Sequence, residues 1–347
     1  MGTVKAAQAA RGARLALFEA TSLAAKGVKD QLAARSFPVS SVRLFTSSTD
    51  PDANLTEFNG EAMLVTAPDE EGLGSLDIAF LCGRREEGAP YLDWPRRRGF
   101  VAIDLTSAAS DVEGVPLVNA GVNPEAISGR PGLIATPGPA AQMVSSLLAP
   151  VRRGPGLQEA TVVVFQPASA AGAGGVEELY QQTVGLLNFH DLPRAVFGRQ
   201  IAFNLVPSSV YGKEAMPGGS EPGRVRDEVL RVTGGGFELA LEVVLAPVFH
   251  CHAVLARLAL PRGAGRGDLL EAFDGNDQVR KERSGESVTP VERAGQGGIV
   301  LAGVKPAAGE NAFWLWAVTD DLQSGTALNA VRIAEAILAK GILRGDA

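Results

Sequence analysis

Residues 14–45 read RLALFEATSLAAKGVKDQLAARSFPVSSVRLF. The stretch begins with a short apolar run at 14–18 and ends with another at 42–45, and both runs are typical of buried strands. Between them, apolar residues recur at helical spacing over 22–35, and Pro38 follows where the helix has to end. A strand, a helix and a second strand in this order predict the first part of a doubly wound parallel sheet.

The rest of the chain extends this prediction in two ways. Short apolar runs at 77–82 and 100–104 add buried parallel strands, and the region 119–136 closes the first domain. Further on, strand-like segments lie at 161–165, 238–247, 253–260 and 314–318, with helical segments at 175–187, 222–232 and 325–343. This mixture predicts an antiparallel or mixed sheet with helices on one face, so we expect an α/β protein of two domains.

Composition excludes several classes of partner. The chain has 347 residues and a net charge of −7 without a basic tract, which argues against nucleic acid or an anionic membrane as the main partner. No segment approaches the roughly 18 uninterrupted apolar residues of a membrane-spanning helix. Two cysteines, Cys82 and Cys251, cannot build a disulfide framework and fit a reducing compartment, so we expect a cytoplasmic protein.

Several fragments, in order along the chain, resemble the aspartate-semialdehyde dehydrogenase family. They are SFPV at 36–39, VPLV at 115–118, VNP at 122–124, FQPAS at 165–169, FGRQIAFNLVP at 197–207, APVFHCH at 246–252, WAVTDDL at 316–322 and GTALNAVRIAE at 325–335. The likeness spans nearly the whole chain after residue 13, and the order and spacing of the fragments carry it.

The resemblance implies an architecture. We expect a flexible tail over 1–13, a Rossmann-like NAD(P)-binding-type domain over 14–137 and an α+β dimerisation and substrate-type domain over 138–324. The last helix, within 325–347, returns to the first domain in this family. The family reduces β-aspartyl phosphate with NADPH. A cysteine thiolate forms a thioacyl intermediate, a histidine handles protons, and arginines hold the carboxylate and phosphate.

The nucleophile of that chemistry is missing from this sequence. The segment that matches the family's cysteine-bearing turn reads ATPGPAAQM over 135–143, with Gly138, Pro139 and Ala140 at the nucleophile position. A thioester route needs a thiol. The chain therefore most resembles the cysteine-less paralogues of the family.

The substrate-binding residues are only partly retained. The family's two arginines fall on Ser110 and Leu245, and its substrate-facing lysine falls on Arg224. Guanidinium groups bind carboxylate and phosphate with matching geometry. Because both arginines are replaced, we expect an anionic substrate to be bound weakly. Gln166 and His252 stand at the family's active-site glutamine and histidine. They either retain a function or satisfy backbone groups at a domain junction.

The nucleotide-binding turn is altered as well. A Gly-x-x-Gly-x-x-Gly turn lets backbone amides approach a pyrophosphate, but the corresponding residues here begin at Glu19 and include Ser22. Glu19 places a carboxylate near the phosphate, which it would repel, and Lys26 offers partial compensation. The positions that the resemblance assigns to NADP are Ala20, Thr21, Ser22, Leu23, Ser47, Ser48 and Gly83. Binding of NADP stays open.

Two of the histidines and the two cysteines are further candidates for a site. His250, Cys251 and His252 fall on a predicted strand, where the two histidines would share one face like a metal pair. No third ligand is evident, so we expect no metal site. Cys251 replaces a glycine of the family and points away from His252 on a regular strand, and Cys82 ends a parallel strand. Both cysteines are expected to be packed and inert.

Three hypotheses follow. The first is a non-catalytic homodimer of the family that acts as a binding or scaffold protein. The second is an NAD(P)-dependent oxidoreductase without thiol chemistry, in which His252 acts as acid or base and Gln166 orients the substrate. The third is a subunit that associates with an active aspartate-semialdehyde dehydrogenase in amino-acid biosynthesis. The sequence names no substrate.

Overall fold

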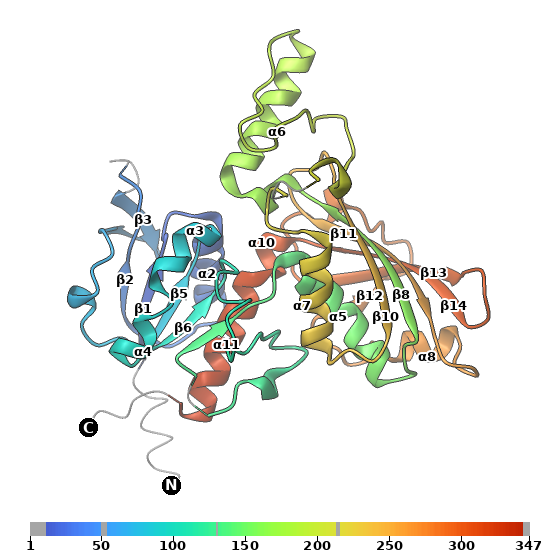
Figure 1. Cartoon of the computed structure of the whole chain (residues 1–347), viewed down its shortest axis with the longest axis horizontal. Coiled ribbons are helices and arrows are strands. Elements are labelled where there is room, and N and C mark those ends of the chain that lie inside the picture. The colour runs from blue at the N-terminus through green and yellow to red at the C-terminus, as the bar shows by residue number, and fades with distance from the viewer. Residues whose placement is uncertain (1–11, 50–53, 130, 213–215, 343–347) are drawn as a thin grey trace. The chain divides into compact units, whose positions relative to one another are not determined.

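The computed structural model describes residues 12–49, 54–129, 131–212 and 216–342, which form two compact units (Figure 1). Unit 1 comprises the described residues up to Pro137 together with those from Thr326 onward, and unit 2 is Gly138–Gly325. Residues 1–11 of the predicted tail and residues 343–347 lie outside the described residues. The predicted doubly wound sheet and the predicted mixed sheet are both present, so the fold class is confirmed.

Unit 1 is built on a parallel sheet of five strands in the order β2-β1-β5-β6-β7. The strands are β1 (Ala13–Phe18), β2 (Val39–Leu44), β5 (Ile78–Leu81), β6 (Val101–Asp104) and β7 (Leu133–Ala135). The predicted tail over 1–13 extends too far, because Ala13 already belongs to β1. Its side chain is buried and its N–H donates to the Pro38 carbonyl at 2.7 Å.

Helices cover this sheet, and one of them comes from the far end of the chain. Unit 1 contains α2 (Leu23–Ala34), α3 (Arg85–Gly88), α4 (Trp94–Arg98) and α11 (Thr326–Lys340). The α11 helix packs against α2 and near β6. Its buried Asn329 fixes the fit, because the side chain donates to the Val118 carbonyl at 2.8 Å and accepts the Ala120 N–H at 2.7 Å.

A short hairpin in unit 1 was missed by sequence reasoning. It consists of β3 (Leu55–Phe58) and β4 (Glu61–Leu64), which pair in antiparallel fashion. The turn between them is Asn59-Gly60, with φ of 51° and 83°. An Asn-Gly pair between two short runs is a strong hairpin signal, so this element could have been predicted.

Unit 2 contains a mixed sheet of seven strands in the order β12-β13-β14-β11-β8-β10-β9. The strands are β8 (Glu159–Gln166), β9 (Val206–Pro207), β10 (Glu238–Leu245), β11 (His252–Ala259), β12 (Val279–Lys281), β13 (Ile299–Pro306) and β14 (Ala312–Thr319). β10 runs parallel to β8, whereas β11 is antiparallel to both β8 and β14. The strands β9, β12 and β13 were not predicted.

Helices cover one face of the unit 2 sheet. The helices of this unit are α5 (Pro139–Arg153), α6 (Gly172–Leu187), α7 (Pro222–Thr233), α8 (Arg266–Glu271), α9 (Pro290–Arg293) and α10 (Asp321–Ser324). Apolar side chains of α5, such as Leu147, share a core with Val162 of β8 and Val243 of β10. Figure 1 shows α6 standing off the end of the sheet. In the part of the chain that the structure describes, no helix is long and apolar enough to cross a bilayer.

Candidate functional site

The first candidate region is the turn from β1 into α2, where a dinucleotide fold receives the pyrophosphate. Ser22 is the N-cap of α2, and its hydroxyl oxygen accepts the N–H of Ala25 at 3.1 Å. Ala20 is fully buried, Thr21 is exposed and Leu23 is half-buried. The Ser22 cap uses one of the amides that would otherwise be available to an anion at this helix end.

The side chain of Glu19, which follows β1, reaches the residues that follow the neighbouring strand β2. Its carboxylate accepts the Ser47 N–H at 2.8 Å through Oε1 and the Thr46 hydroxyl at 3.2 Å through Oε2. The Thr46 oxygen in turn accepts the N–H of Ser48 at 3.1 Å. Glu19 is only 6% exposed and has a φ of +51°, a conformation that glutamate rarely adopts. The carboxylate therefore binds donors at the edge of the sheet where such folds hold the adenosine ribose.

Gly83 packs directly against Glu19. It follows β5 with a φ of +91°, and a Cβ atom there would lie 2.9 Å from Glu19 Cγ and 2.5 Å from Glu87 Oε2. Only glycine fits this position, for conformational and steric reasons together. Lys26, expected as a compensating charge, instead pairs with Asp30 at 2.8 Å on the exposed side of α2. As they stand, the donors at the end of β2 are occupied by the Glu19 carboxylate and are not available to a dinucleotide.

The second candidate region is the N-terminus of α5 in unit 2, which the resemblance assigns to the nucleophile. Gly138 is the N-cap, Pro139 is the first helical residue and Ala140 is buried. The Gly138 N–H donates to Glu228 Oε2 at 2.8 Å, and Arg224 Nε donates to Glu228 Oε1 at 3.2 Å. Sequence reasoning missed Glu228, since no local pattern connects two residues that are 90 positions apart.

Gln166 and His252 are both fully buried in unit 2. The Gln166 amide donates to the Pro217 carbonyl at 2.7 Å, and its Oε1 has no hydrogen-bond partner among the described residues. His252 is the first residue of β11, and its Nδ1 lies 3.6 Å from Asp321 Oδ1. This separation exceeds a hydrogen bond, and within the described chain neither ring nitrogen of His252 has a hydrogen-bond partner.

Asp321 lies next to His252 and was also missed by sequence reasoning. Its Oδ2 accepts the Ser169 hydroxyl at 3.0 Å and its Oδ1 accepts the Cys251 N–H at 3.1 Å. Burial alone would raise the pKa of Asp321. The nearby His252 and the Ser169 hydroxyl outweigh that effect, so the pKa lies below its usual range. The carboxylate is therefore kept charged beside the imidazole.

The prediction of a strand through His250, Cys251 and His252 is wrong. β11 begins at His252, and Cys251 precedes it with a φ of +77°, so the two histidines do not share a strand face. Among the residues that the structure describes, no group of three or more histidine, cysteine, aspartate or glutamate side chains could hold a metal ion. The left-handed backbone at Cys251 is the conformation for which glycine is best suited.

Both cysteines are buried and carry no activated thiol. Burial, followed by the negative charges of Asp320 and Asp321, raises the pKa of Cys251 to about 12. Burial also raises the pKa of Cys82 well above its usual range. A thiolate is the reactive form, so neither residue is prepared for nucleophilic attack near neutral pH. The residues at the family's arginine positions are likewise buried, with Ser110 in unit 1 and Leu245 in the core of unit 2.

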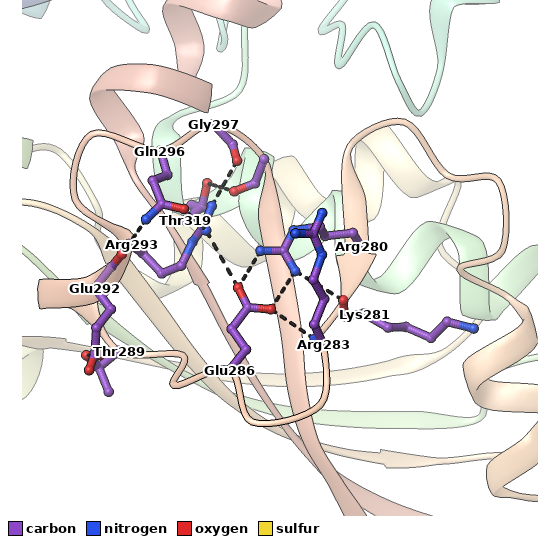
Figure 2. Close-up of polar contacts among 11 residues, drawn as sticks. Arg280, Lys281, Arg283, Glu286, Thr289, Glu292, Arg293, Gln296, Gly297 and Thr319 are labelled. Atoms are coloured by element: carbon purple, nitrogen blue, oxygen red, sulfur yellow. Dashed lines mark hydrogen bonds and ion pairs between the residues drawn. The ribbon is translucent and has the colours of Figure 1, made fainter.

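Polar contacts connect the side chains of the loop between β12 and β13 (Figure 2). Arg280 pairs with Glu286, and the buried Arg293 donates to Gln296 Oε1 at 2.6 Å and to the Gly297 carbonyl at 2.9 Å. Further along the same loop, the Gly295 N–H donates to Asp320 Oδ2 at 2.6 Å. These contacts are internal to the loop and to the end of β14. They pair the guanidinium groups of Arg280 and Arg293 with groups of the loop itself.

Comparison with known proteins places both units in one family. Residues 20–130 match the sequence model of the semialdehyde dehydrogenase NAD-binding domain, and residues 148–323 match that of the semialdehyde dehydrogenase dimerisation domain. Among curated relatives, aspartate-semialdehyde dehydrogenase 2 of Vibrio cholerae is 29% identical over 338 residues, covering 93% of this chain and 97% of the relative. Aspartate-semialdehyde dehydrogenase of Streptomyces akiyoshiensis is 29% identical over 350 residues, covering 94% and 99%.

Solved structures give the same result. Aspartate semialdehyde dehydrogenase II of Vibrio cholerae, complexed with ASA, superposes with a TM-score of 0.86 at 26% identity, covering 94% of this chain and 98% of that one. A probable aspartate-semialdehyde dehydrogenase of Pseudomonas aeruginosa gives 0.85 at 25% identity, covering 94% and 99%. The Candida albicans enzyme with NADP gives 0.74 at 15% identity, which supports the fold alone.

Proposed function

The chain belongs to the semialdehyde dehydrogenase family, and within it we propose a dimeric member that does not catalyse the family's thiol-dependent reaction. The observation that carries this proposal is the N-terminus of α5. The segment before and into this helix contains no cysteine, and the Gly138 N–H is occupied by the carboxylate of Glu228. An acyl intermediate requires a nucleophile, and the Glu228 carboxylate places a negative charge at the helix N-terminus that would otherwise favour a thiolate.

The surrounding residues support the same proposal. Cys82 and Cys251 are buried thiols with raised pKa values, so neither replaces the missing nucleophile. Ser110 and Leu245 stand where the resemblance implies arginines, and both are buried. Arg224, the remaining cation near this region, is paired with Glu228 at 3.2 Å. A substrate bearing a carboxylate and a phosphate would find few of the bidentate donors that such groups require.

The direct test is a steady-state assay with aspartate semialdehyde, phosphate and NADP. The Vibrio cholerae relative, assayed under identical conditions, serves as the active control. We expect no turnover by this chain above the rate without protein. Turnover within about a hundredfold of the control would contradict the proposal, because removal of a covalent nucleophile costs far more than that.

The dimer is the second part of the proposal. The matched dimerisation domain covers residues 148–323. Leu255 of β11 is 36% exposed and pairs in register with Trp316 of β14, whose ring contacts that of Phe165. Beyond α6, Phe189 and Phe203 are also largely exposed. Such side chains are suited to burial against a second copy. Light scattering should give about twice the 36.0 kDa mass of one chain, and the monomer mass would refute the dimer.

One observation favours a second candidate function, an NAD(P)-dependent oxidoreductase without thiol chemistry. His252 is buried next to Asp321, and within the described residues both of its ring nitrogens lack a hydrogen-bond partner. Buried polar groups are normally paired, and an unpaired imidazole could handle a proton for a substrate. A screen of aldehydes and ketones with NADPH and NADH tests this candidate. It fails if His252→Ala leaves every detectable activity unchanged.

The same dimer surface leaves room for a heteromeric partner. A chain of this family that retains the cysteine could pair with this one through the region 148–323. Co-expression of this chain with a cysteine-bearing homologue from the same genome, followed by affinity purification of either one, tests the pairing. Recovery of homodimers alone would exclude a role as a partner subunit.

A further inference from the structure

We propose that Glu19 is an internal ligand. Its carboxylate occupies the subsite that would bind a phosphate on the adenosine ribose of a nucleotide, and its side chain alone closes that subsite. We call this region the adenosine subsite and define it as Thr46, Ser47 and Ser48 together with Glu19. The inference goes beyond the function proposed above, because that function concerns the missing nucleophile of unit 2 whereas Glu19 lies at the nucleotide end of unit 1.

The donors of the adenosine subsite are those that an anion would use. The Ser47 N–H and the Thr46 hydroxyl both donate to the Glu19 carboxylate, at 2.8 and 3.2 Å. Both donors are uncharged and follow β2, at the carboxyl edge of a parallel sheet, where nucleotides bind in such folds. A carboxylate oxygen and a phosphate oxygen accept the same kinds of hydrogen bond. The side chain therefore takes the place of a ligand group rather than packing as a core residue.

The adenosine subsite lies at the surface, and the buried side chain of Glu19 occupies it. Ser47 and Ser48 are exposed, whereas Glu19 is only 6% exposed. Thr46 is only 2% exposed, so the subsite is open to solvent on the side of Ser47 and Ser48 alone. The side chain that covers the donors projects from the end of β1, the next strand in the sheet. In many dinucleotide-binding folds, an acidic residue that follows β2 reads the ribose hydroxyls. Here the acidic group arrives from β1 and uses the donors itself.

The backbone at Glu19 indicates that the surrounding turn does not require a side chain. Its φ of +51° is readily adopted by glycine and disfavoured for glutamate. The turn makes its own backbone hydrogen bonds, since the Ser22 N–H donates to the Glu19 carbonyl and the Ala20 N–H to the Phe45 carbonyl, both at 2.9 Å. Glycine at position 19 would keep these bonds and free the donors at the end of β2. The variant Glu19→Gly is therefore expected to fold.

The test is calorimetric titration of the full chain with adenosine 2′-monophosphate and, separately, adenosine 5′-monophosphate. These probes differ only in the position of the phosphate, and neither carries the pyrophosphate that would need the altered turn at Ser22. For Glu19→Gly we expect binding of the 2′-monophosphate to tighten at least about tenfold over the wild type, the scale of one charge-assisted hydrogen bond. The 5′-monophosphate should gain less.

Two control variants make the result decisive. Glu19→Gln keeps the size of the side chain and an oxygen that accepts the Ser47 N–H, so we expect it to bind no better than the wild type. Asn59→Gly places glycine at the same φ of 51°, in the β3–β4 turn of the same unit, and should also behave like the wild type. A Glu19→Gly variant that keeps its thermal transition and still fails to gain affinity overturns the proposal. Equal gains in Glu19→Gln, or equal gains for both probes, overturn it too.

The outcome is separable from that of the proposed function. Turnover by the wild-type chain would refute the absence of catalysis, whatever Glu19→Gly does. Failure of Glu19→Gly to bind the 2′-monophosphate, with a wild-type chain that neither turns over nor binds NADPH, would refute only the role of Glu19.

Discussion

Glu19 in unit 1 and Glu228 in unit 2 each place a carboxylate on a backbone N–H that an anionic ligand could otherwise use. Both are buried and both accept that N–H at 2.8 Å. Their settings differ. Glu228 lies within the regular helix α7 and is paired with Arg224, whereas Glu19 has a left-handed backbone and neutral donors. The comparison predicts that the fold of unit 2 depends on Glu228 and that unit 1 tolerates the loss of Glu19.

The largest expected effect comes from Glu228→Ala. Glu228 accepts hydrogen bonds from both Arg224 and the Gly138 N–H, and the substitution removes this acceptor from a largely buried site. We therefore expect the free energy of unfolding of unit 2 to fall by about 3 kcal/mol. Urea unfolding followed by tryptophan fluorescence in a Trp94→Phe background reports on unit 2, because Trp314 and Trp316 both lie there.

Glu228→Gln is the matched control, and it should cost about half as much because the amide oxygen still accepts the Gly138 N–H. A Glu228→Ala variant within about 0.5 kcal/mol of the wild type would break the comparison, since that is the scale of an ordinary surface substitution.

Low pH should destabilise unit 2 through a second carboxylate of its framework, Glu286. Hydrogen bonds from Arg280 lower the pKa of Glu286 to about 2, from an ordinary value near 4.5. A carboxyl whose folded pKa is depressed stabilises the native state above its unfolded pKa, and that contribution is lost as the pH falls through the folded value. We therefore expect unit 2 to lose stability between about pH 4.5 and pH 2. Glu286→Gln should flatten this dependence, and the exposed Glu310→Gln should leave it unchanged.

A smaller effect distinguishes the two substitutions at Glu19. Glu19→Gly loses two hydrogen bonds but relieves the left-handed backbone, so its stability should stay within about 1 kcal/mol of the wild type. Glu19→Ala loses the same hydrogen bonds and keeps the strain, so it should be less stable than Glu19→Gly by about 1 kcal/mol. Thermal unfolding measures the difference. Greater stability of the alanine variant, the usual order in regular structure, would show that the backbone at this position is not strained.

The last prediction is that neither thiol reacts in the native chain. Unit 1 contains Cys82 and unit 2 contains Cys251. Cys82 and Cys251 are buried and their pKa values are raised, so at pH 8 a disulfide reagent should modify neither in the native chain. Both should react in denaturant, which provides the control. Rapid labelling of Cys251 in the native protein would show a reactive thiol and would contradict the conclusion that this cysteine cannot replace the missing nucleophile.

Most of the framework could be predicted from the sequence. Runs that are apolar on both faces, such as 77–82 and 100–104, correspond to β5 and β6, and the periodic stretch near the C-terminus corresponds to α11. Such elements are determined by the residues that they contain. The strand β13 was missed although it is paired on both sides, between β12 and β14, because Gly303 and Lys305 interrupt its apolar pattern and its pairing partners are supplied by the fold.

The candidate sites were less accessible to sequence reasoning. The sequence shows that position 19 holds a glutamate and that no cysteine precedes α5, but not what the carboxylates contact. Glu19 reaches Ser47 across 28 positions, Glu228 reaches Gly138 across 90, and Asp321 reaches Ser169 across 152. These contacts exist only once the sheets are assembled. Local patterns therefore carry no information about them.

The left-handed backbone at Glu19 also has a meaning for the gene that encodes this chain. Every glutamate codon becomes a glycine codon when its middle base changes from A to G. The turn already has the shape that glycine favours, so no second change is needed for the fold to accept it. The closed subsite and the open one are in this sense neighbouring alleles, and a population carrying this gene would produce the open form repeatedly by spontaneous point mutation.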